Sequence, residues 1–350
     1  RRQRQMCIRD SNLANLRSNV RFYRGTIKSN VEISAVVKSN AYGLGITKLV
    51  PALEKYGVKI FFTATLAEAI KVRKCSPHSE IFTLNGFDFQ RSDLYREFDI
   101  APVINNFLEA KKFIEIFHQS HKTALQINTG MNRLGLDKKT LLKNIDIINL
   151  LPLTLILSHL ACADDINNKE NIAQKDLFLG LCKFMPNTRK SISASHGTLL
   201  GSEFHLDMVR PGVGLYGGIR NNGLRQVIQI KIPVLQNFVI DKDMQVGYNF
   251  TYKAKKPMKV ATLAMGYADG LPRTLSNRGK LFCGNKSCPI IGRVSMDLVT
   301  VDISGLSEIP EYLNVFSPEY QVDDFAKDCQ TISHEVLVNF GERVNRIYSE

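Results

Sequence analysis

Lys38 is the side chain of this sequence that could most directly do covalent chemistry. It follows the apolar residues of the segment AVVKSNAYGLG, which runs from Ala35 to Gly45. An amine at the end of a buried strand is partly desolvated, and desolvation lowers the pKa of a lysine. A lysine with a lowered pKa can form a Schiff base with a carbonyl compound. Taken alone, the pattern fits a lysine that reaches the surface after a strand equally well.

Other polar residues also stand at the ends of apolar runs. They are Arg133 in NTGMNRLGL, His159 in LSHLACADD, Ser195 in SASHG and Arg210 in MVRPGVGLYGG. Each of them alone has a structural explanation, and a lone histidine at a strand end is more often a hydrogen-bonded structural residue. Together with Lys38 they mark five run ends, which is much harder to explain as coincidence.

A phosphate site is one interpretation of the segment around residue 212. Ser195 and the backbone amides of Gly212 and Val213 could hold a phosphate, because glycine lets the backbone approach a ligand closely. The alternative is a tight turn without a ligand.

Two polar groups stand in the last third of the chain. Tyr267 lies in AMGYADGLPR, at the exit of a predicted strand. Met296 and Asp297 lie inside the strand pattern of GRVSMDLVTVDIS. Taken alone, the pattern indicates only a tyrosine in a turn and a methionine in the core.

The first two thirds of the chain alternate short apolar runs with helical patterns. Several runs are apolar throughout, as strands buried on both faces should be. The predicted strands are Glu32–Lys38, Ile60–Ala64, Glu80–Asn85, Ile100–Ile104, Thr123–Asn128, Leu153–His159, Ser191–Ser195 and Met208–Tyr216. The helical patterns are Gly45–Tyr56, Leu66–Lys74, Asn106–His118, Lys138–Asn149 and Lys169–Phe184.

These β/α units, spaced about 20 to 35 residues apart, predict a TIM-like (β/α)₈ barrel, whose functional residues lie at the carboxyl ends of its strands. A doubly wound sheet is the alternative, but no G-x-G-x-x-G follows the first strand. After about Leu224 the helical periodicity nearly vanishes. Predicted strands there are Val227–Leu235, Lys259–Met265, Ile290–Val294 and Leu298–Ile303. We therefore expect an α/β fold with a barrel domain over residues 1–224 and a mainly β domain over residues 225–350.

The composition excludes several classes of protein. The 350 residues are 44% hydrophobic and 23% charged, which is typical of globular domains and not of disordered, collagenous or coiled-coil chains. The most apolar stretch, residues 147–163, is interrupted by polar residues and proline, whereas a membrane span needs about 20 mostly apolar residues. No apolar core follows the basic start of the chain, so we expect neither a membrane span nor a signal peptide.

Charge and cysteine content narrow the choice further. The net charge of +13 comes from scattered basic residues, which favours a solvated surface or a basic cleft for small anions over a nucleic-acid site. The seven cysteines form no C-x-x-C pair and have no histidines at zinc-site spacing. We expect reduced thiols, no metal site and a cytoplasmic protein.

Four motifs in combination resemble one family. AVVKSNAYGLG, RPGVGLYG, GYADG and GRVSMD are similar to motifs of the alanine racemases, enzymes with a (β/α)₈ barrel and a C-terminal β domain. The resemblance runs nearly end to end, and the family's lysine motif, typically AVVKANAYGHG, is highly specific in this company. It implies a homodimer that binds pyridoxal 5'-phosphate and interconverts L-alanine and D-alanine for peptidoglycan, without a nucleic-acid or membrane partner.

The resemblance also implies a role for each site residue. Lys38 holds the cofactor and is one catalytic base, and the partner's Tyr267 is the second base on the opposite face of the substrate. Arg210 hydrogen-bonds the pyridine nitrogen, and His159 lies beside the ring and supports Arg210. The phosphate is held by Tyr42, Ser195, Gly212 and Val213. Arg133 and the backbone of Met296 engage the cofactor phenolate and the substrate carboxylate, and Asp297 helps to shape the wall that the partner contributes.

Racemisation gives these roles a physical basis. A proton must leave one face of Cα and arrive on the other, which requires two bases on opposite sides. The proton becomes acidic only when the amine is joined to an electron-withdrawing cofactor. Arginine stays protonated because its pKa exceeds about 12, so a pyridine nitrogen that faces Arg210 carries no proton, and transamination should be suppressed. Tyrosine has an unperturbed pKa near 10, so Tyr267 needs nearby positive charge, for which Arg210, relayed through His159, is the candidate.

Four positions depart from the family pattern. Gln126 stands where many members have a lysine that becomes carbamylated and neutralises the arginine at position 133. Arg133 would then need chloride, another acid or the substrate carboxylate. Asn128 replaces a common aspartate, and Ala194 replaces the asparagine before the phosphate serine. His334 replaces a tyrosine that commonly contacts the phosphate, and a contact of His334 with phosphate or a purely structural role are equally compatible with the sequence.

Three other functions remain open at this point. A serine or broad-specificity racemase differs only in pocket size, which the sequence does not determine. A non-catalytic pyridoxal-phosphate carrier of the single-barrel type would leave about 125 C-terminal residues without a purpose. A nucleic-acid binder is motivated only by the net charge, and it would show steeply salt-dependent binding to arbitrary DNA.

Overall fold

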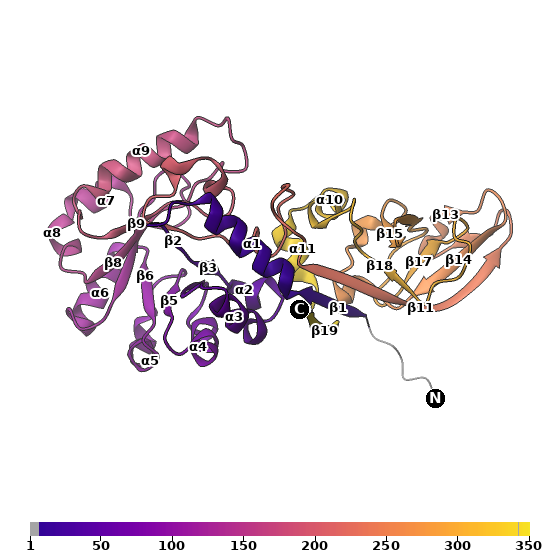
Figure 1. The fold of residues 1–350 in the computed structure, drawn as a ribbon, viewed down its shortest axis with the longest axis horizontal. Helices are drawn as coiled ribbons and strands as arrows, with labels where there is room; N and C mark the ends of the chain where they lie inside the picture. The colour runs from indigo at the N-terminus through magenta and orange to yellow at the C-terminus, as the bar shows by residue number, and fades with distance from the viewer. Residues whose placement is uncertain (1–6, 342) are drawn as a thin grey trace. The chain divides into compact units, whose positions relative to one another are not determined.

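A computed structural model describes residues 7–341 and 343–350. The chain forms two compact units, which are described separately (Figure 1). The barrel unit comprises Asn19–Ala41 and Gly45–Leu215. The described residues of the β unit are 7–18, 42–44, 216–341 and 343–350.

The barrel unit is a ring of parallel strands. Strands β3 to β9 pair in chain order, and β2 pairs with β10 in parallel. Only Ser34 separates β2 from β3, and a parallel bridge between Ala194 and Arg210 joins β10 to the chain after β9, which closes the ring. The strands are β2 (Glu32–Ile33), β3 (Ala35–Val36), β4 (Ile60–Thr63), β5 (Glu80–Thr83), β6 (Ala101–Ile104), β7 (Thr123–Gln126), β8 (Leu153–Leu157), β9 (Arg189–Ser191) and β10 (Met208–Val209). A closed ring excludes the doubly wound alternative, and the predicted barrel fold is confirmed.

Helices cover the outside of this ring (Figure 1). They are α3 (Ile46–Lys55), α4 (Leu66–Cys75), α5 (Ser92–Glu97), α6 (Phe107–Phe117), α7 (Lys138–Lys143), α8 (Ile145–Ile148) and α9 (Glu170–Cys182). Polar caps set several of their starts: the side chain of Thr65 accepts from the backbone of Glu68 at α4, and that of Asn106 accepts from Glu109 at α6. Such caps satisfy amides that have no partner inside the helix.

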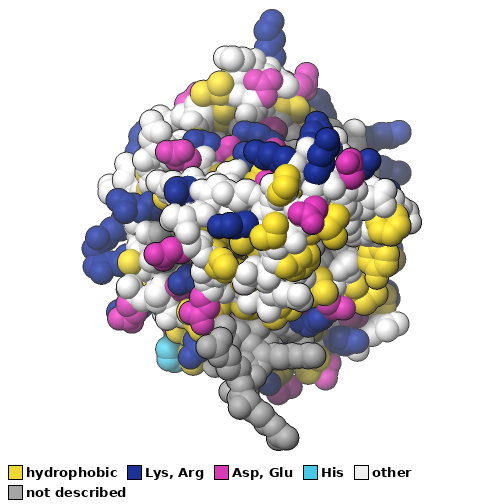
Figure 2. Space-filling model, turned by 90° about the vertical axis from the view of Figure 1, so that its right-hand side faces the viewer, with side chains coloured by type: hydrophobic (Ala, Val, Ile, Leu, Met, Phe, Trp, Pro, Cys, Tyr) yellow, Lys and Arg dark blue, Asp and Glu magenta, His cyan; other side chains and the backbone are white. Residues whose placement is uncertain are grey.

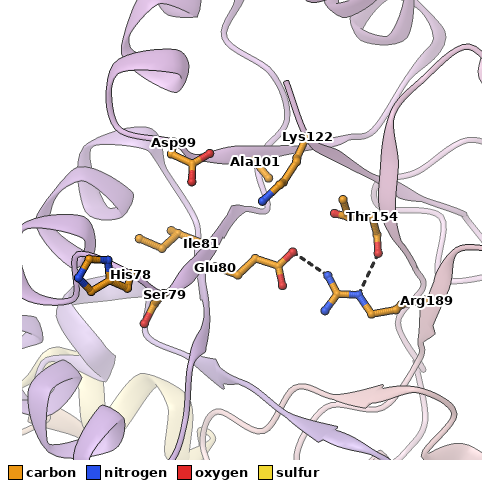
Figure 3. A pocket seen from close by; sticks show the side chains of 9 residues that line it. All are labelled: His78, Ser79, Glu80, Ile81, Asp99, Ala101, Lys122, Thr154 and Arg189. Carbon is orange, nitrogen blue, oxygen red and sulfur yellow. Dashed lines mark hydrogen bonds and ion pairs between the residues drawn. The ribbon is translucent and has the colours of Figure 1, made fainter. Parts of the chain in front are cut away.

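The amino ends of the strands form the floor of the barrel, where charges are paired (Figure 3). Arg189, at the start of β9, bonds Glu32 at 2.8 Å and Glu80 at 2.6 Å. Its Nε donates to the carbonyl of Thr154 at 3.0 Å. A cavity of about 440 Å³ lies beside this network. Because one arginine joins its own strand, β9, to three others, the network stabilises the closed ring.

The β unit is built on a mixed sheet. The strands that the structure describes in it run in the order β16, β15, β18, β11, β1 and β19, and β14 pairs with both β11 and β17. They are β1 (Ile8–Asn12), β11 (Ile228–Ile240), β14 (Met258–Leu263), β15 (Lys280–Cys283), β16 (Lys286–Pro289), β17 (Val299–Asp302), β18 (Tyr312–Asn314) and β19 (Asn345–Ser349). β1 is parallel to β19 and antiparallel to β11, so the first and last described strands lie side by side.

Several details of the predicted β region are wrong. Residues 290–294 do not form a strand, because β16 ends at Pro289 and Gly292 has φ 72°. Met296 and Asp297 lie in a turn rather than in a strand, since the hydroxyl of Ser295 accepts from the amide of Leu298 at 3.1 Å. Two helices also occur, α10 (Val322–Asp328) and α11 (Ser333–Asn339), so the region is mainly β but not all β.

Among the described residues, no helix is long and apolar enough to cross a bilayer. They also contain no group of three or more His, Cys, Asp or Glu side chains placed to hold a metal ion. All seven cysteines fall within these residues and are free.

Candidate active site

Lys38 lies two positions after the last residue of β3, at the carboxyl end of the barrel strands, and is half-buried. Burial lowers the pKa of its amine below the usual value of 10.5. The positive charge of Arg133 lowers that pKa further, while Glu68 raises it. The first two influences keep more of the amine neutral at a given pH, which is what an amine that attacks a carbonyl group requires.

The residues after Lys38 form a left-handed turn. Ser39, Asn40, Ala41 and Tyr42 have φ between 52° and 55°. Residues other than glycine pay about 1–2 kcal/mol each for this conformation, so the surroundings must hold it. The Glu68 carboxylate accepts from the amide of Ser39 at 2.6 Å, and the Asn40 side chain accepts from the amide of Ile46 at 2.9 Å. Sequence reasoning missed Glu68, because its link to Ser39 depends on the packing of α4.

Arg210 follows β10 and is buried. Its guanidinium donates to the carbonyl of Ser158 at 2.6 Å and to the hydroxyl of Ser191, and it lies 5.9 Å from the ring centre of Phe62. Among the described residues no carboxylate forms an ion pair with it. Burial lowers its pKa to about 10, so the group remains a cation at neutral pH and its charge is not compensated by an acid.

Ser195 is held in a backbone cradle. Its Oγ accepts from the amide of Gly212 at 2.8 Å and from the amide of Gly214 at 3.1 Å. A Cβ on Gly214 would lie 2.0 Å from the hydroxyl of Tyr23, so glycine is required there. Val213, between the two glycines, is buried. The sequence indicated Ser195, Gly212 and Val213, but it gave no sign of Gly214 or Tyr23.

Arg133 is exposed and lies in a loop that closes on itself. Ile127 and Leu136 form a parallel bridge at the base of the loop. The Asn128 side chain accepts from the amide of Asn132 at 3.0 Å. Gln126 donates from Nε2 to the carbonyl of Leu134 at 3.4 Å, so its amide contacts the loop backbone beside Arg133.

His159 follows β8 and is half-buried. Its carbonyl accepts from the Gln174 side chain at 3.2 Å. The residue before it, Ser158, supplies the carbonyl that binds Arg210. Support of Arg210 by the His159 side chain stays a prediction.

Tyr42 and His334 lie together in the β unit. The ring of Tyr42 lies 4.9 Å from that of Tyr216 and 5.9 Å from that of His334. Burial raises the pKa of the Tyr42 hydroxyl above its usual value, so the hydroxyl is a hydrogen-bond donor at neutral pH.

Tyr267 begins the 3₁₀ turn η5 (Tyr267–Asp269) and is 45% exposed. Its amide donates to the carbonyl of Ser295 at 3.0 Å, and the amide of Ala268 donates to that of Met296 at 3.0 Å. The two loops that carry Tyr267 and Met296 are therefore joined through their backbones.

Arg343 adds a second link between these loops. It lies 3.3 Å from the carboxylate of Asp269 and 2.7 Å from that of Asp297. The same Asp269 accepts from the amide of Gly266 at 2.9 Å. The sequence did not indicate Arg343 or Asp269.

The donors at the carboxyl end of the barrel fit pyridoxal phosphate. Lys38 offers a partly desolvated amine to an aldehyde. The amides of Gly212 and Gly214 hold the oxygen of Ser195, whose hydroxyl can donate to a phosphate, with glycine where a Cβ would not fit. The buried cation of Arg210 suits a ring nitrogen that accepts a hydrogen bond. A barrel with these groups after its strands defines a pyridoxal-phosphate-dependent enzyme of the barrel class.

Comparisons with known proteins identify the family. Models of the alanine racemase N-terminal and C-terminal domains match residues 11–220 and 227–348. The alanine racemase of Cereibacter sphaeroides is 38% identical over 91% of each chain, and that of Rickettsia akari is 35% identical over 99% of each. The crystal structure of alanine racemase from Bartonella henselae with covalently bound pyridoxal phosphate superposes with a TM-score of 0.93 at 34% identity, over 98% of this chain and 99% of that one. The chain belongs to the alanine racemase family and is a pyridoxal-phosphate-dependent amino-acid racemase.

Proposed function

We propose that the protein interconverts L-alanine and D-alanine with two bases, Lys38 and the partner's Tyr267. The observation that carries this proposal is the place of Lys38, half-buried and two positions after the end of a barrel strand. Burial there lowers the pKa of its amine. The cofactor, when bound, delocalises the negative charge that develops on the substrate Cα. Lys38 moves the proton on one face, and the phenol of Tyr267 moves it on the other.

The remaining groups of the barrel unit bind and orient. Ser195, Gly212 and Val213 hold the phosphate, and the family resemblance assigns Tyr42 to the phosphate as well. Arg210 keeps its proton, because even its lowered pKa of about 10 is well above neutral pH. It therefore donates to the pyridine nitrogen and does not protonate it, which limits charge withdrawal into the ring and disfavours transamination.

Substrate recognition falls to Arg133 and the backbone of Met296. Arg133 offers an exposed cation to the substrate carboxylate. Gln126 carries no charge and therefore does not neutralise Arg133, and its amide donates to the carbonyl of Leu134. Asp297 holds the Met296 loop through Arg343. His334 supports Tyr42 through ring contact.

A homodimer follows from the role of Tyr267. Apolar side chains gather on the face of the β unit in Figure 2, and several large ones are exposed, including Tyr248 at 70% and Phe250 at 65%. Tyr267 and Met296 are also exposed. Large exposed apolar patches mark interfaces, so the apolar face in Figure 2 supports a dimer in which each β unit serves the other subunit.

We also infer a cytoplasmic role in supplying D-alanine for peptidoglycan. The free thiols, four of them buried, support a reducing compartment. The product class fits cell-wall synthesis, because peptidoglycan is the bacterial polymer in which the resemblance places D-alanine.

Borohydride trapping tests the proposal most directly. Protein loaded with pyridoxal phosphate is reduced and digested, and the modified peptide is identified by mass spectrometry. We expect the label on Lys38 and loss of the cofactor absorbance in Lys38→Ala. A label on another lysine would reject the assignment.

Isotope exchange tests the second base. In Tyr267→Phe, exchange of the Cα proton of L-alanine for deuterium should fall far more than that of D-alanine, because only one face has lost its base. Equal losses for both enantiomers would contradict the two-base assignment. A panel of amino acids, with serine included, measures how strictly alanine is preferred.

A further inference from the structure

The left-handed turn after Lys38 ends in a segment held by three side chains of the β unit. Residues 42–44 belong to that unit, although the chain on both sides belongs to the barrel unit. Three side chains donate to the consecutive carbonyls of this segment. Arg9 donates to the carbonyl of Tyr42 at 3.4 Å, and Arg346 donates to that of Gly43 at 3.1 Å. The hydroxyl of Tyr348 donates to the carbonyl of Leu44 at 2.7 Å. Arg9 lies on β1, and Arg346 and Tyr348 lie on β19. The three donors are called the carbonyl clamp below.

The clamp leaves little room for another arrangement. Gly43 has φ 75°, and a Cβ there would lie 2.9 Å from the carbonyl of Leu337 and 3.3 Å from Nη1 of Arg9. Only glycine therefore fits beneath Arg9 without displacing a backbone group.

Arg9 itself is an expensive residue to place here. It is fully buried, and within the described residues it has no carboxylate partner and its Nε has no hydrogen-bond acceptor. Within the described part of the chain, the acceptors of its guanidinium are three carbonyls, those of Leu337 and Phe340 at the end of α11 and that of Tyr42. Burying a cation without an acid is unfavourable. The hydrogen bonds that Arg9 makes to these carbonyls fix the path of the backbone at residue 42.

We propose that Arg9, Arg346 and Tyr348 are positioning residues for the cofactor lysine. They act through the backbone: the clamp holds the end of the left-handed turn, while Glu68 holds its start at the amide of Ser39. The amide of Ala41 donates back to the carbonyl of Val37 at 2.8 Å, so displacement of the turn moves the three residues between them, the first of which is Lys38. Strained segments persist only where their surroundings fix them.

The predicted consequence concerns the fraction of molecules with a competent lysine. Apparent affinity for a ligand falls in proportion to the competent fraction. Loosening the clamp should therefore weaken cofactor binding without changing any group that touches the cofactor. The inference rests on the proposed role of Lys38 for its link to the cofactor, but the order of the turn can be measured without that role.

Tyr348→Phe is the sharpest test, because it removes the hydroxyl and keeps the ring. Hydrogen exchange of the cofactor-free chain is followed by mass spectrometry in peptides that cover residues 39–50. Cofactor affinity is measured by absorbance titration. We expect exchange in this segment to rise about fivefold and affinity to fall about fivefold, the factor that one net hydrogen bond contributes. Arg346→Met should act similarly, and Arg346→Lys, which keeps a donor, should recover part of the loss.

Tyr95→Phe is the matched control. Its hydroxyl also donates to a carbonyl, that of Gly86 at 3.3 Å, far in sequence from the turn. It should change neither exchange in residues 39–50 nor cofactor affinity. The proposal is overturned if Tyr348→Phe lowers only the melting temperature and matches the control in both readouts. Trapping of the cofactor on another lysine, with exchange still raised, would instead overturn the assignment of Lys38 and leave the clamp in place.

Discussion

The two ends of the barrel treat positive charge in opposite ways. At the floor, Arg189 is neutralised by two carboxylates, Glu32 and Glu80. At the carboxyl end, neither Lys38 nor Arg210 forms an ion pair with a carboxylate of the described residues. Both sets of cations are partly or fully buried, so burial alone does not distinguish them. The difference is compensation: cations paired within the chain stabilise the fold, and uncompensated cations are available to an anionic cofactor and substrate.

Arg210→Met should give the largest effect and should fall on activity. Loss of a preorganised charged donor reduces catalysis by at least about 100-fold. The free energy of unfolding of the cofactor-free chain should change by no more than about 1 kcal/mol, because removing an unpaired buried charge is favourable and offsets the loss of the hydrogen bonds to Ser158 and Ser191. Racemase assays and denaturant unfolding measure the two quantities. A large loss of stability with activity retained would reverse our interpretation of this end of the barrel.

Arg189→Met should show the opposite pattern. It leaves two carboxylates without their partner, and because the arginine side chain is 30% exposed the loss should be about 1–3 kcal/mol in unfolding free energy, below the range for a fully buried pair. Activity per folded molecule should be unchanged. Arg91→Met is the control, since it breaks an exposed pair with Asp88 and should cost less than about 1 kcal/mol. Equal denaturation midpoints for Arg189→Met and Arg91→Met would show that the ion pairs at the floor do not stabilise the fold.

The smallest expected effect is a shift in the pH dependence of cofactor attachment. Only the neutral amine attacks an aldehyde, and burial lowers the pKa of Lys38 below 10.5. The attachment rate should therefore reach half its maximum at a pH below 10.5. Arg133→Gln should move that midpoint up, because a repelling cation is gone, and Glu68→Gln should move it down. Stopped-flow absorbance across pH measures the midpoint.

Salt provides the control for this shift. Arg133 is exposed, so its influence should weaken at high ionic strength. If neither Arg133→Gln nor Glu68→Gln changed the pH midpoint of attachment, burial alone would set the pKa of Lys38.

The sequence predicted those strands and helices whose buried side chains are apolar. Strand β4, apolar apart from its final Thr63, lies inside the predicted run Ile60–Ala64. The same reasoning missed β1, because the inward residues of that strand are Arg9 and Ser11, which are polar although fully buried. Hydrophobic periodicity carries no signal for such a strand.

The residues of the candidate site likewise fall into those that the sequence predicts and those that only the structure shows. Motifs located Lys38, Arg210 and Ser195, because chemistry-bearing residues at the ends of apolar runs are visible in sequence. Glu68 and Gly214 were missed because their roles depend on contacts between distant segments. The turn at Met296 was missed because one serine side chain, that of Ser295, outweighs an otherwise regular alternation.

The pairing of β1 with β19 has a consequence for biosynthesis. Residues 8–12 are synthesised before the barrel unit, yet their parallel neighbours are residues 345–349. The barrel strands can pair while translation continues, but the pairing of β1 with β19 must wait until residues 345–349 have been made. We therefore expect a chain cut before residue 345 to lack this pairing and to capture its vitamin-derived group poorly.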